Sequence, residues 1–522
     1  MSKRRDRRLR ADPRLDGAGQ GSGETLRRSV VSGLLWKGTS QITTQVTRFG
    51  VAVILARLLS PHDYGIAGMV LVFMAFVLVF SDFALGNTLV QRRELTDIDS
   101  STAFWTSVGA GATFTVGGIL LAQPVASFFG EPTIRPMIMV LSLSFLVQSL
   151  GVTQSALLVR DMAFRGLELR EMTATIIGGA AGVALALRGA GAWAIIAQQL
   201  TGAVIATALV WHYAKWKPST AFSRQSLRGF AGFSANVFGT NVAAQLRGTT
   251  DNVLIGRVIG PAALGSYALA YNLVLVPFNR IAVPLSQVLF PALSRVQDDR
   301  ARIGELWTRS LRLVAAIALP SCVGLLVVGA DVVEVVLGTK WHSAAPIVQL
   351  LAVVGLLQTL QFLNPIVLQA VDRTSILLRW SLVSYGATLV AFIIGLHWGA
   401  VGVAAAYAVV SGVTEPLYAR ATARAIGLPF SALARAVSGP LQAATIMAVA
   451  LVAVRLVLAA VGAEPEVRLP VLVVGGIASF AAGLAWRAGD VRVELGRLLG
   501  RRRQETGDAV TASKVEASSA AR

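Results

Sequence analysis

Residues 51–65 read VAVILARLLSPHDYG, and 200 residues later residues 251–265 read DNVLIGRVIGPAALG. Each stretch closes a long apolar run, and in each an arginine, a proline and a glycine follow at four-residue intervals. The matched residues are Arg57 and Arg257, Pro61 and Pro261, and Gly65 and Gly265. Because proline and glycine interrupt helices, we expect each run to be a helix that ends in a tight turn, with its arginine at a membrane interface.

A second pair of matching stretches shows that the repeat extends over several helices. PMIMVLSLSFLVQSL at 136–150 aligns with PIVQLLAVVGLLQTL at 346–360, at an offset of 210 residues. The shared residues are Pro136 and Pro346, Leu141 and Leu351, Leu146 and Leu356, Gln148 and Gln358, and Leu150 and Leu360. Two nearly constant offsets, each joining helices six apart, predict two six-helix halves of the same orientation. Parallel repeats of this kind place substrate sites between the halves, near the middle of the bilayer.

Composition places these helices in a membrane. Of the 522 residues, 54% are hydrophobic and only 14% are charged, and the mean hydropathy is +0.64. We count fourteen apolar runs of about the 20 residues that cross a bilayer. They lie near 33–58, 66–90, 103–122, 136–158, 172–187, 191–213, 230–256, 264–291, 311–329, 346–370, 376–396, 399–419, 437–461 and 469–487. The sequence therefore predicts an all-α integral membrane protein with about 14 transmembrane helices, in two parallel six-helix lobes plus two extra C-terminal helices.

The net charge of +19 has an uneven distribution along the chain. Lysine and arginine cluster in MSKRRDRRLR, QRRELTD, RDMAFRGLELR, AKWKPSTAFSRQSLR, SRVQDDRARIGELWTRSLR and RLLGRRR, whereas the loops SPHDYG, QPVASFFGEPTIR, GPAALG and HWGAVG carry at most one basic residue. This alternation follows the positive-inside rule and predicts that both termini are cytoplasmic. We therefore attribute the basic excess to membrane topology and expect no nucleic-acid partner.

These observations predict the organisation of the whole chain. The expected parts are a disordered basic cytoplasmic arm at 1–28, an N-lobe at 29–215, a cytoplasmic linker at 216–226, a C-lobe at 227–425, two further helices within 437–487 and a disordered cytoplasmic tail at 501–522.

Several classes of function are excluded by what the sequence lacks. The single cysteine, Cys322, excludes an intramolecular disulfide, and the four histidines are scattered without the spacing of metal ligands. No nucleophile elbow, nucleotide-binding loop or dinucleotide fingerprint is present. We expect no metal, no cofactor and no enzymatic activity.

Polar side chains follow one face of the first predicted helix. Lys37, Gln41, Gln45 and Arg48 are spaced by four, four and three residues, which places them on one side of a helix. Arg48 falls near the middle of the membrane, where a charge costs on the order of 3 kcal/mol unless it faces a wet cavity or a partner. Arg48 is therefore a candidate for binding a ligand in a cavity.

The seventh predicted helix has the same design. One polar stripe consists of Asn236, Thr240, Arg247 and Asp251, and the adjacent one consists of Ser234, Asn241, Gln245 and Asn252. Arg247 lies one position before the repeat image of Arg48. Arginine binds phosphate oxygens in pairs, so two such helices would form a cationic cavity for an anionic, phosphate-bearing ligand. Arg247 and Asp251 could instead neutralise each other as a structural pair.

Other polar residues are candidates of lower rank. Without an ATP-binding domain, energy must come from an ion gradient, the membrane potential or consumption of the product, and Asp251 and Glu415 are the carboxylates that could couple transport to protons or sodium. Lys37 could set topology or contact lipid headgroups, and Asp82 could cap or pair at the cytoplasmic half of the second helix. Arg280, in the eighth helix, is a further candidate.

From about residue 29 to 430 the chain resembles a known transporter family. The most specific segments are ARLLSPHDYGIAGMV at 56–70, SDFALGNTLVQRRELTDIDSSTAFW at 81–105, GTTDNVLIGRVIGPAALGSYALAYNL at 248–273, FNRIAVPLSQVLFPALSRVQDDRAR at 278–302 and VLGTKWHSAAPIVQLLAVVGLLQTL at 336–360. They resemble the Wzx-like polysaccharide-transporter branch of the multidrug, oligosaccharidyl-lipid and polysaccharide exporter superfamily, the flippases for lipopolysaccharide, capsule and exopolysaccharide.

This resemblance implies a MATE-like, two-lobed transporter of the bacterial plasma membrane. The implied cargo is an undecaprenyl-diphosphate-linked oligosaccharide, flipped by alternating access, and by position Arg48 and Arg247 would bind its diphosphate or acidic sugars. Membrane lipids and the polysaccharide polymerase or ligase machinery would be its other partners. The alternatives are an ion-coupled multidrug antiporter, for which an acidic cavity is expected, and a flippase for the lipid-linked peptidoglycan precursor. A membrane-embedded polymerase is disfavoured because no predicted external loop exceeds about 20 residues.

Overall fold

The structure is a computed structural model that describes residues 41, 43–81, 89, 95–227, 245 and 248–487. Within these residues all regular secondary structure is helical. Eight helical stretches there are long and apolar enough to cross a membrane. The protein is thus an all-α, multi-pass membrane protein, as the composition predicted. The arm at 1–28, the tail at 501–522 and the candidates Lys37, Asp82, Asn241 and Arg247 lie outside the described residues.

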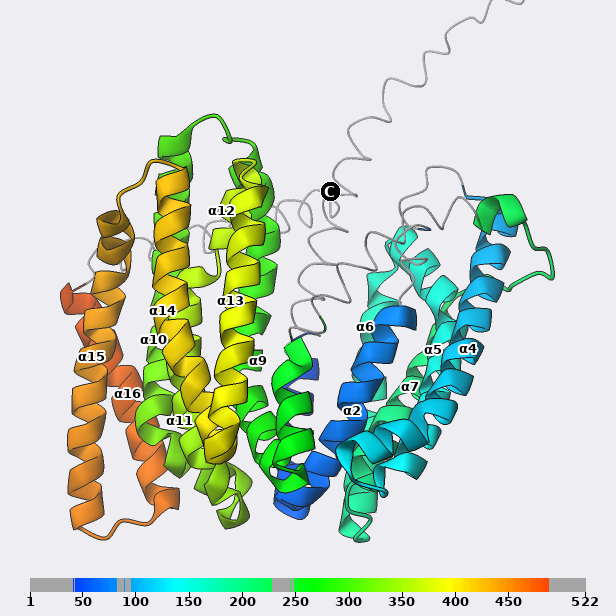
Figure 1. Ribbon diagram of the computed structural model, residues 1–522, viewed down its shortest axis with the longest axis horizontal. Coiled ribbons are helices and arrows are strands. Elements are labelled where there is room, and N and C mark those ends of the chain that lie inside the picture. Colours follow the sequence, from blue (N-terminus) through cyan, green and yellow to red (C-terminus); the bar gives the residue numbers. More distant parts are fainter. Residues whose placement is uncertain are drawn as a thin grey trace, which may run out of the picture. The chain divides into compact units, whose positions relative to one another are not determined.

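Figure 1 shows the helices of the described residues, coloured along the sequence. In chain order they are α2 (Pro61–Ser81), α4 (Asp97–Phe129), α5 (Ile134–Arg160), α6 (Phe164–Leu187), α7 (Trp193–Tyr213), α9 (Pro261–Ser294), α10 (Arg300–Val332), η1 (Val333–Leu337), η2 (Thr339–Ala344), α11 (Ala345–Gln361), α12 (Asn364–Ala370), α13 (Thr374–Gly395), η3 (Leu396–Trp398), α14 (Gly399–Ala425), α15 (Phe430–Ala460) and α16 (Pro465–Arg487). Residues 43–58 and 248–258 are also helical. Every predicted apolar run overlaps one of these helices, and the number of membrane crossings, fourteen, stays a prediction.

The chain forms two compact units. The first comprises residues 1–55, 74–123 and 135–243, and the second comprises 56–73, 124–134 and 244–522. Two short segments of the first half of the sequence therefore pack with the second unit. The division into an N-lobe and a C-lobe, which was drawn from the repeat, stays a prediction.

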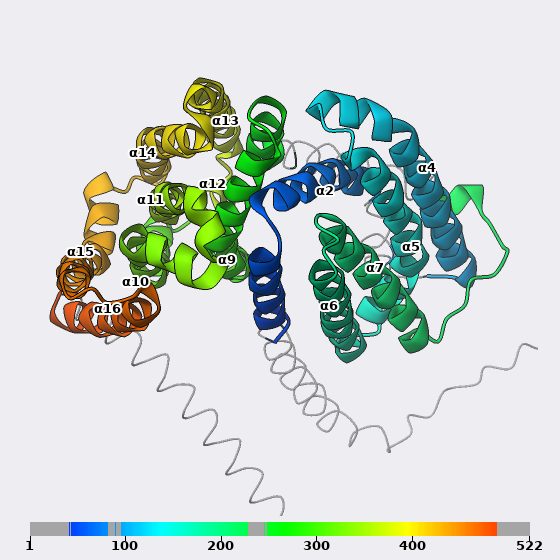
Figure 2. The same ribbon diagram turned by 90° about the horizontal axis from the view of Figure 1, so that it is seen from below.

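In the first unit, α6 and α7 pack together along small residues (Figure 2). Gly178 of α6 is buried against α7, and a Cβ added to it would lie 2.8 Å from the carbonyl oxygen of Gln198 and 3.2 Å from the backbone of Gly202. Small residues at such crossings let two membrane helices approach closely. The close approach brings polar side chains of α6 and α7, among them Glu171 and Gln198, to one cavity.

The predicted linker at 216–226 lies against α4 of the same unit. The backbone N–H of Ser219 donates to the Ser101 hydroxyl at 3.0 Å, and its carbonyl accepts from Trp105 Nε1 at 2.8 Å. The N–H of Ser223 donates to the Thr102 hydroxyl at 3.0 Å. These bonds tie the segment to the beginning of α4.

In the second unit, α10 packs against α11 and α15, and α11 packs against α14. The core contains Trp307, Leu311 and Val367, all almost fully buried. α15 and α16 form a hairpin that packs on α10 (Figure 1). Three charged residues also join these helices.

The charged contact centres on Asp331, near the end of α10, whose side chain is fully buried. Arg468 Nε of α16 donates to its Oδ1 at 2.6 Å, and Arg455 Nε of α15 lies 3.2 Å from its Oδ2. Arg455 also donates to the carbonyl oxygen of Val327 at 2.7 Å. A buried carboxylate requires such neutralisation, so this triad anchors both C-terminal helices to α10.

The repeated helix ends differ from the sequence prediction in one respect. The chain does turn after residue 58 and after residue 258, but Pro61 and Pro261 begin the next helices, where a missing N–H costs nothing. The expectation that the glycines belong to the turn was wrong, because Gly65 and Gly265 lie inside α2 and α9. These two helices begin earlier than the apolar runs at 66–90 and 264–291 because their first turns carry polar or small residues.

Both repeated arginines have partners within the second unit. Arg57 donates from Nε to the Val336 carbonyl at 3.0 Å and from Nη2 to the Val335 carbonyl, both in the π-helical turn η1. The guanidinium carbon of Arg257 lies 5.7 Å from the centre of the Phe128 ring. Both residues therefore make specific contacts in addition to any contact with the membrane interface.

Candidate functional site

A polar cavity of about 840 Å³ lies in the first unit, lined by α5, α6, α7 and the helix of residues 43–58. We call it the first-unit cavity. Its polar lining includes Arg48, Gln148, Arg170, Glu171, Gln198 and Gln199. So many polar groups on apolar helices are typical of a substrate or ion pathway rather than of a packing surface.

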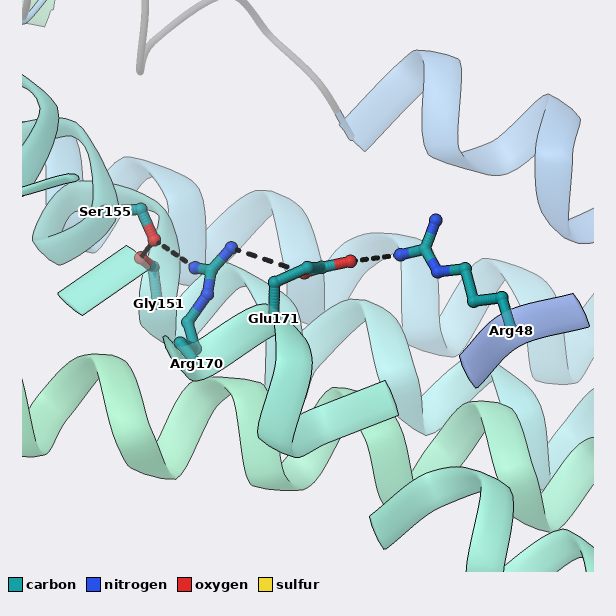
Figure 3. Close-up of polar contacts among 5 residues, drawn as sticks. All are labelled: Arg48, Gly151, Ser155, Arg170 and Glu171. Carbon is teal, nitrogen blue, oxygen red and sulfur yellow. Dashed lines mark hydrogen bonds and ion pairs between the residues drawn. The ribbon is translucent and has the colours of Figure 1, made fainter. Parts of the chain in front are cut away.

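Three charged side chains of this lining contact one another (Figure 3). Arg48 makes an ion pair with Glu171 through Nη2 and Oε1. Arg170 Nη2 lies 3.9 Å from the other oxygen of Glu171, and its Nη1 donates to the Ser155 hydroxyl at 2.8 Å. Ser155 in turn donates to the Gly151 carbonyl at 2.7 Å. The bonds from α5 hold Arg170 in place, and a single carboxylate lies between two guanidinium groups.

The charge balance of this cluster favours an anion. Two arginines and one glutamate leave a net charge of +1, and the side chains of Arg48 and Glu171 remain 41% and 38% exposed. A phosphate or diphosphate group offers more acceptor oxygens than one carboxylate does, and guanidinium binds such groups through two N–H bonds at once. The cluster can therefore exchange the carboxylate of Glu171 for an anionic ligand.

A second cavity of about 370 Å³ lies in the second unit, lined by residues 248–251, α9, α11–α12, α13 and α14. We call it the second-unit cavity. It contains Asp251 and Glu415, the two carboxylates that the sequence singled out for ion coupling. Its aromatic lining residues are Tyr271, Phe362, Trp380, Tyr385, Phe392, Tyr407 and Tyr418.

Both carboxylates of the second-unit cavity are buried, Asp251 to 5% exposure and Glu415 to 7%. The Tyr267 hydroxyl donates to Asp251 Oδ2 at 2.9 Å, and the backbone N–H of Asn252 donates to Oδ1 at 2.8 Å. Two carboxylates at one intramembrane cavity can bind a proton or a cation. The structure thus brings together two residues that are far apart in the sequence.

Three other predicted site residues that the structure describes, Gln41, Gln45 and Gln245, do not line these cavities. Gln41 and Gln45 share the helix of Arg48 but do not line the first-unit cavity, and Gln245 does not line the second. Arg280 lies within α9, and its side chain is outside the described residues. Lys37, Asp82, Asn241 and Arg247 lie outside the described residues, and their roles stay predictions.

Sequence reasoning missed Arg170 and Glu171. They belong to RDMAFRGLELRE, whose basic residues were assigned to a cytoplasmic loop, but α6 begins at Phe164 and carries both into the cavity. One feature of the sequence could have indicated Glu171. An arginine within the membrane, such as Arg48, needs an opposite charge, and Glu171 directly precedes the fifth predicted run. Among the described residues, no three His, Cys, Asp or Glu side chains are placed to hold a metal ion.

Comparison with solved structures defines the class of fold. The structure matches lipid II flippase MurJ in an inward closed conformation, with a TM-score of 0.69 over 88% of this chain and 99% of that chain, at 16% identity. It also matches an inward-facing multidrug resistance MATE family transporter, with a TM-score of 0.57 over 74% and 95% of the two chains, at 14% identity. The protein therefore has the transporter fold that MurJ and MATE proteins share.

Sequence comparison narrows this class to one family. Residues 54–346, more than half of the chain, match the family model described as "Polysaccharide biosynthesis protein". The chain belongs to this family.

Relatives of the chain are named for the biosynthesis of lipopolysaccharide, succinoglycan and teichuronic acid. The lipopolysaccharide biosynthesis protein WzxC of Escherichia coli is 29% identical over 73% of this chain and 78% of its own. The succinoglycan biosynthesis transport protein ExoT of Rhizobium meliloti is 27% identical over 81% and 85% of the two chains. The teichuronic acid biosynthesis protein TuaB of Bacillus subtilis is 26% identical over 87% and 94%.

Proposed function

We propose that this protein is a flippase that moves a polyprenyl-diphosphate-linked oligosaccharide across the bacterial plasma membrane, by alternating access, for the synthesis of a surface polysaccharide. Family membership and the names of WzxC, ExoT and TuaB support the polysaccharide part of this function. The fold shared with a lipid flippase supports transport rather than enzymatic chemistry. Both termini would face the cytoplasm, and the polymerase or ligase that consumes the flipped product would be a functional partner.

The observation that carries this proposal is the cluster of Arg48, Arg170 and Glu171 in the first-unit cavity. The diphosphate would bind to both arginines and displace Glu171 from Arg48. When the diphosphate leaves, Glu171 would pair with Arg48 again, which avoids an unpaired arginine within the membrane. This exchange gives the cavity a stable empty state as well as a loaded state.

An energy source can be proposed from the second-unit cavity. Asp251 and Glu415 would take up a proton or a sodium ion in one conformation and release it in the other. A ligand shifts a conformational equilibrium only by its difference in affinity between the two states. Ion binding at these carboxylates would therefore drive transport only if the cavity changes between the states.

The test is flipping of an undecaprenyl-diphosphate-linked oligosaccharide in proteoliposomes, for the parent and for Arg48→Ala, Arg48→Lys and Arg170→Ala. We expect Arg48→Ala to weaken farnesyl diphosphate binding roughly 10- to 100-fold, the effect of losing a charged hydrogen-bond donor, and to slow flipping. Arg48→Lys should retain part of the diphosphate binding and part of the flipping rate, because lysine keeps the charge but not the paired donors.

The matched control for these variants is Arg302→Ala. Arg302 also forms an ion pair, at 2.7 Å with Glu305, but both side chains are more than half exposed and lie outside both cavities. Flipping should be unchanged in this variant. Unchanged flipping in Arg48→Ala and Arg170→Ala would disprove the role of the arginine cluster, and absence of flipping by the parent with several glycan lengths would disprove the proposed function.

A further inference from the structure

The two cavities occupy matching positions in the internal repeat. Gln148 on α5 lines the first-unit cavity, and Gln358, 210 residues later on α11, lines the second-unit cavity. The same offset relates further lining residues of the two cavities: Gly151 and Gln361, Val152 and Phe362, Ser155 and Pro365, Ala174 and Ser384, Thr175 and Tyr385, and Gly178 and Thr388. The cavities are therefore repeat images of each other.

The helices α7 and α14, which line the first-unit and the second-unit cavity, also correspond in the repeat. Gly191, with φ of 56°, precedes α7, and Gly399, with φ of 72°, begins α14, at an offset of 208 residues. This left-handed backbone favours glycine and marks equivalent turns. At this offset the lining residues again correspond: Gln199 and Tyr407, Thr207 and Glu415, and Val210 and Tyr418.

The repeat images differ most where the first-unit cavity is charged. Gly248 stands at the image of Arg48, Trp380 at the image of Arg170 and Ser381 at the image of Glu171. All three charges of the cluster are thus replaced by a glycine, an aromatic ring and a hydroxyl group. No arginine or lysine is among the described residues that line the second-unit cavity. Among the described lining residues there is thus no counterpart of the two arginines that would bind a diphosphate.

Contacts with neighbouring side chains hold the aromatic groups in place. The Trp380 ring stacks on Tyr418 with ring centres 5.9 Å apart and an angle of 23°. The Tyr385 hydroxyl lies 3.1 Å from Thr250 Oγ1, and Gln358 Nε2 donates to the Tyr407 hydroxyl at 3.0 Å. Trp380 and Tyr385 are only partly buried, so part of each ring remains available to a ligand.

We propose that the second-unit cavity is a glycan subsite, which binds a neutral sugar unit of the lipid-linked oligosaccharide; this inference rests on the proposed function. A sugar ring has apolar C–H faces, which an aromatic ring covers, and hydroxyl groups, which amides and hydroxyls of Gln358, Gln361 and Ser384 can bond. The volume of about 370 Å³ lies within the range of roughly 300–1,000 Å³ for small-molecule sites. One half of the repeat thus takes the charged part of the substrate, and the other takes the neutral part.

An organic cation is the competing class of ligand, because aromatic rings and carboxylates also attract cations. Two features favour the sugar. The proposed function assigns the two carboxylates to ion coupling, and neutral amide and hydroxyl groups outnumber these carboxylates in the lining. A cation would need the carboxylates, whereas a sugar needs the rings and the neutral polar groups.

The experiment measures ligand binding to the full-length protein in lipid nanodiscs. The neutral probes are the methyl glycosides of glucose, galactose, mannose and N-acetylglucosamine, and the cationic probe is tetraphenylphosphonium. Saturation-transfer NMR and calorimetry measure the binding of each probe. We expect at least one glycoside to bind. Trp380→Ala and Tyr385→Ala should each weaken its binding roughly three- to tenfold, as loss of an aromatic contact predicts. Trp398→Ala is the matched control, since Trp398 is 70% exposed and outside the lining.

Two further measurements keep the outcomes distinct. Two milder variants replace Trp380→Ala if that variant does not fold. Trp380→Phe retains an aromatic ring and should retain most glycoside binding. Gln361→Ala changes only a half-buried amide and should weaken glycoside binding. No glycoside binding, binding equal in all variants, or tetraphenylphosphonium binding that the carboxylate variants alone abolish would overturn the glycan subsite. If the parent flips lipid-linked oligosaccharide while Trp380 and Tyr385 variants keep the same apparent KM, the subsite fails and the flippase function stands. If the parent flips none, the proposed function itself fails.

Discussion

Gly65 of α2 lies directly against the backbone of Pro261, the first residue of α9. A Cβ added to Gly65 would overlap the carbonyl oxygen of Pro261, and a Cβ on Gly265 would overlap that of Pro61. The repeated helix beginnings thus contact each other reciprocally within the second unit. This contact explains why the sequence repeats a glycine four residues after each proline.

The first prediction concerns this crossing. Gly65→Ala or Gly265→Ala should destabilise the protein by about 1–3 kcal/mol, because the added methyl group meets rigid backbone and forces the helices apart. Thermal unfolding of the purified protein measures the change. Gly386→Ala, in α13 with nothing within 4 Å of a new Cβ, is the control and should be neutral or stabilising by up to about 1 kcal/mol. Equal melting temperatures for all three variants would contradict the close approach.

The second prediction concerns Glu171, which competes with an anionic ligand for Arg48. Glu171→Gln should tighten farnesyl diphosphate binding roughly two- to fivefold, the worth of a partly exposed ion pair. It should also slow flipping, because release of the diphosphate would leave Arg48 without its carboxylate partner. Calorimetry and the proteoliposome assay give the two values. Weaker binding in this variant would show that Glu171 supports the ligand instead of competing with it.

The third prediction concerns the anchor of the last two helices. Asp331→Asn leaves Arg455 and Arg468 without their shared carboxylate and should cost about 3 kcal/mol, the lower end for a broken buried pair, because both arginines stay partly exposed. Hydrogen exchange should rise across α15 and α16. Glu305→Gln, which breaks an exposed pair on the same helix, is the control. Unaltered exchange in α15 and α16 would mean that apolar packing alone holds them.

The fourth prediction concerns ion coupling. Asp251→Asn and Glu415→Gln remove one charge each with little change in shape, so the response of flipping to an imposed proton or sodium gradient should fall in both. Flipping without a gradient should persist at a reduced rate. Asp298→Asn, an exposed acidic residue after α9, is the control. A full gradient response in both cavity variants would assign coupling to other groups.

Much of the fold could be read from the sequence because it depends on local properties. Hydropathy over about 20 residues shows which segments are apolar enough to cross the membrane, and each predicted run overlaps a helix in the described residues. The positions at which helices begin were predicted less accurately. α6 starts at Phe164, eight residues before the predicted run, because hydropathy marks the apolar part of a helix and the first turns of α6 carry charged residues.

The candidate site was only partly predictable. The cost of an arginine within the membrane singled out Arg48, and the same reasoning for carboxylates singled out Asp251 and Glu415. The partner of Arg48 lies 123 residues away on another helix, and no local pattern shows which helices pack together.

The sequence by itself determined that this protein is a helical membrane protein with an internal repeat, since composition, apolar length and repeated residues are properties of the chain alone. Only the tertiary structure decided that Arg48 pairs with Glu171 and that Asp251 and Glu415 share one cavity. It also showed that the images of the Arg48, Arg170 and Glu171 cluster form an uncharged, aromatic part of the second cavity. Such pairings depend on the packing of helices distant in sequence, which is set by side-chain contacts among all of them together.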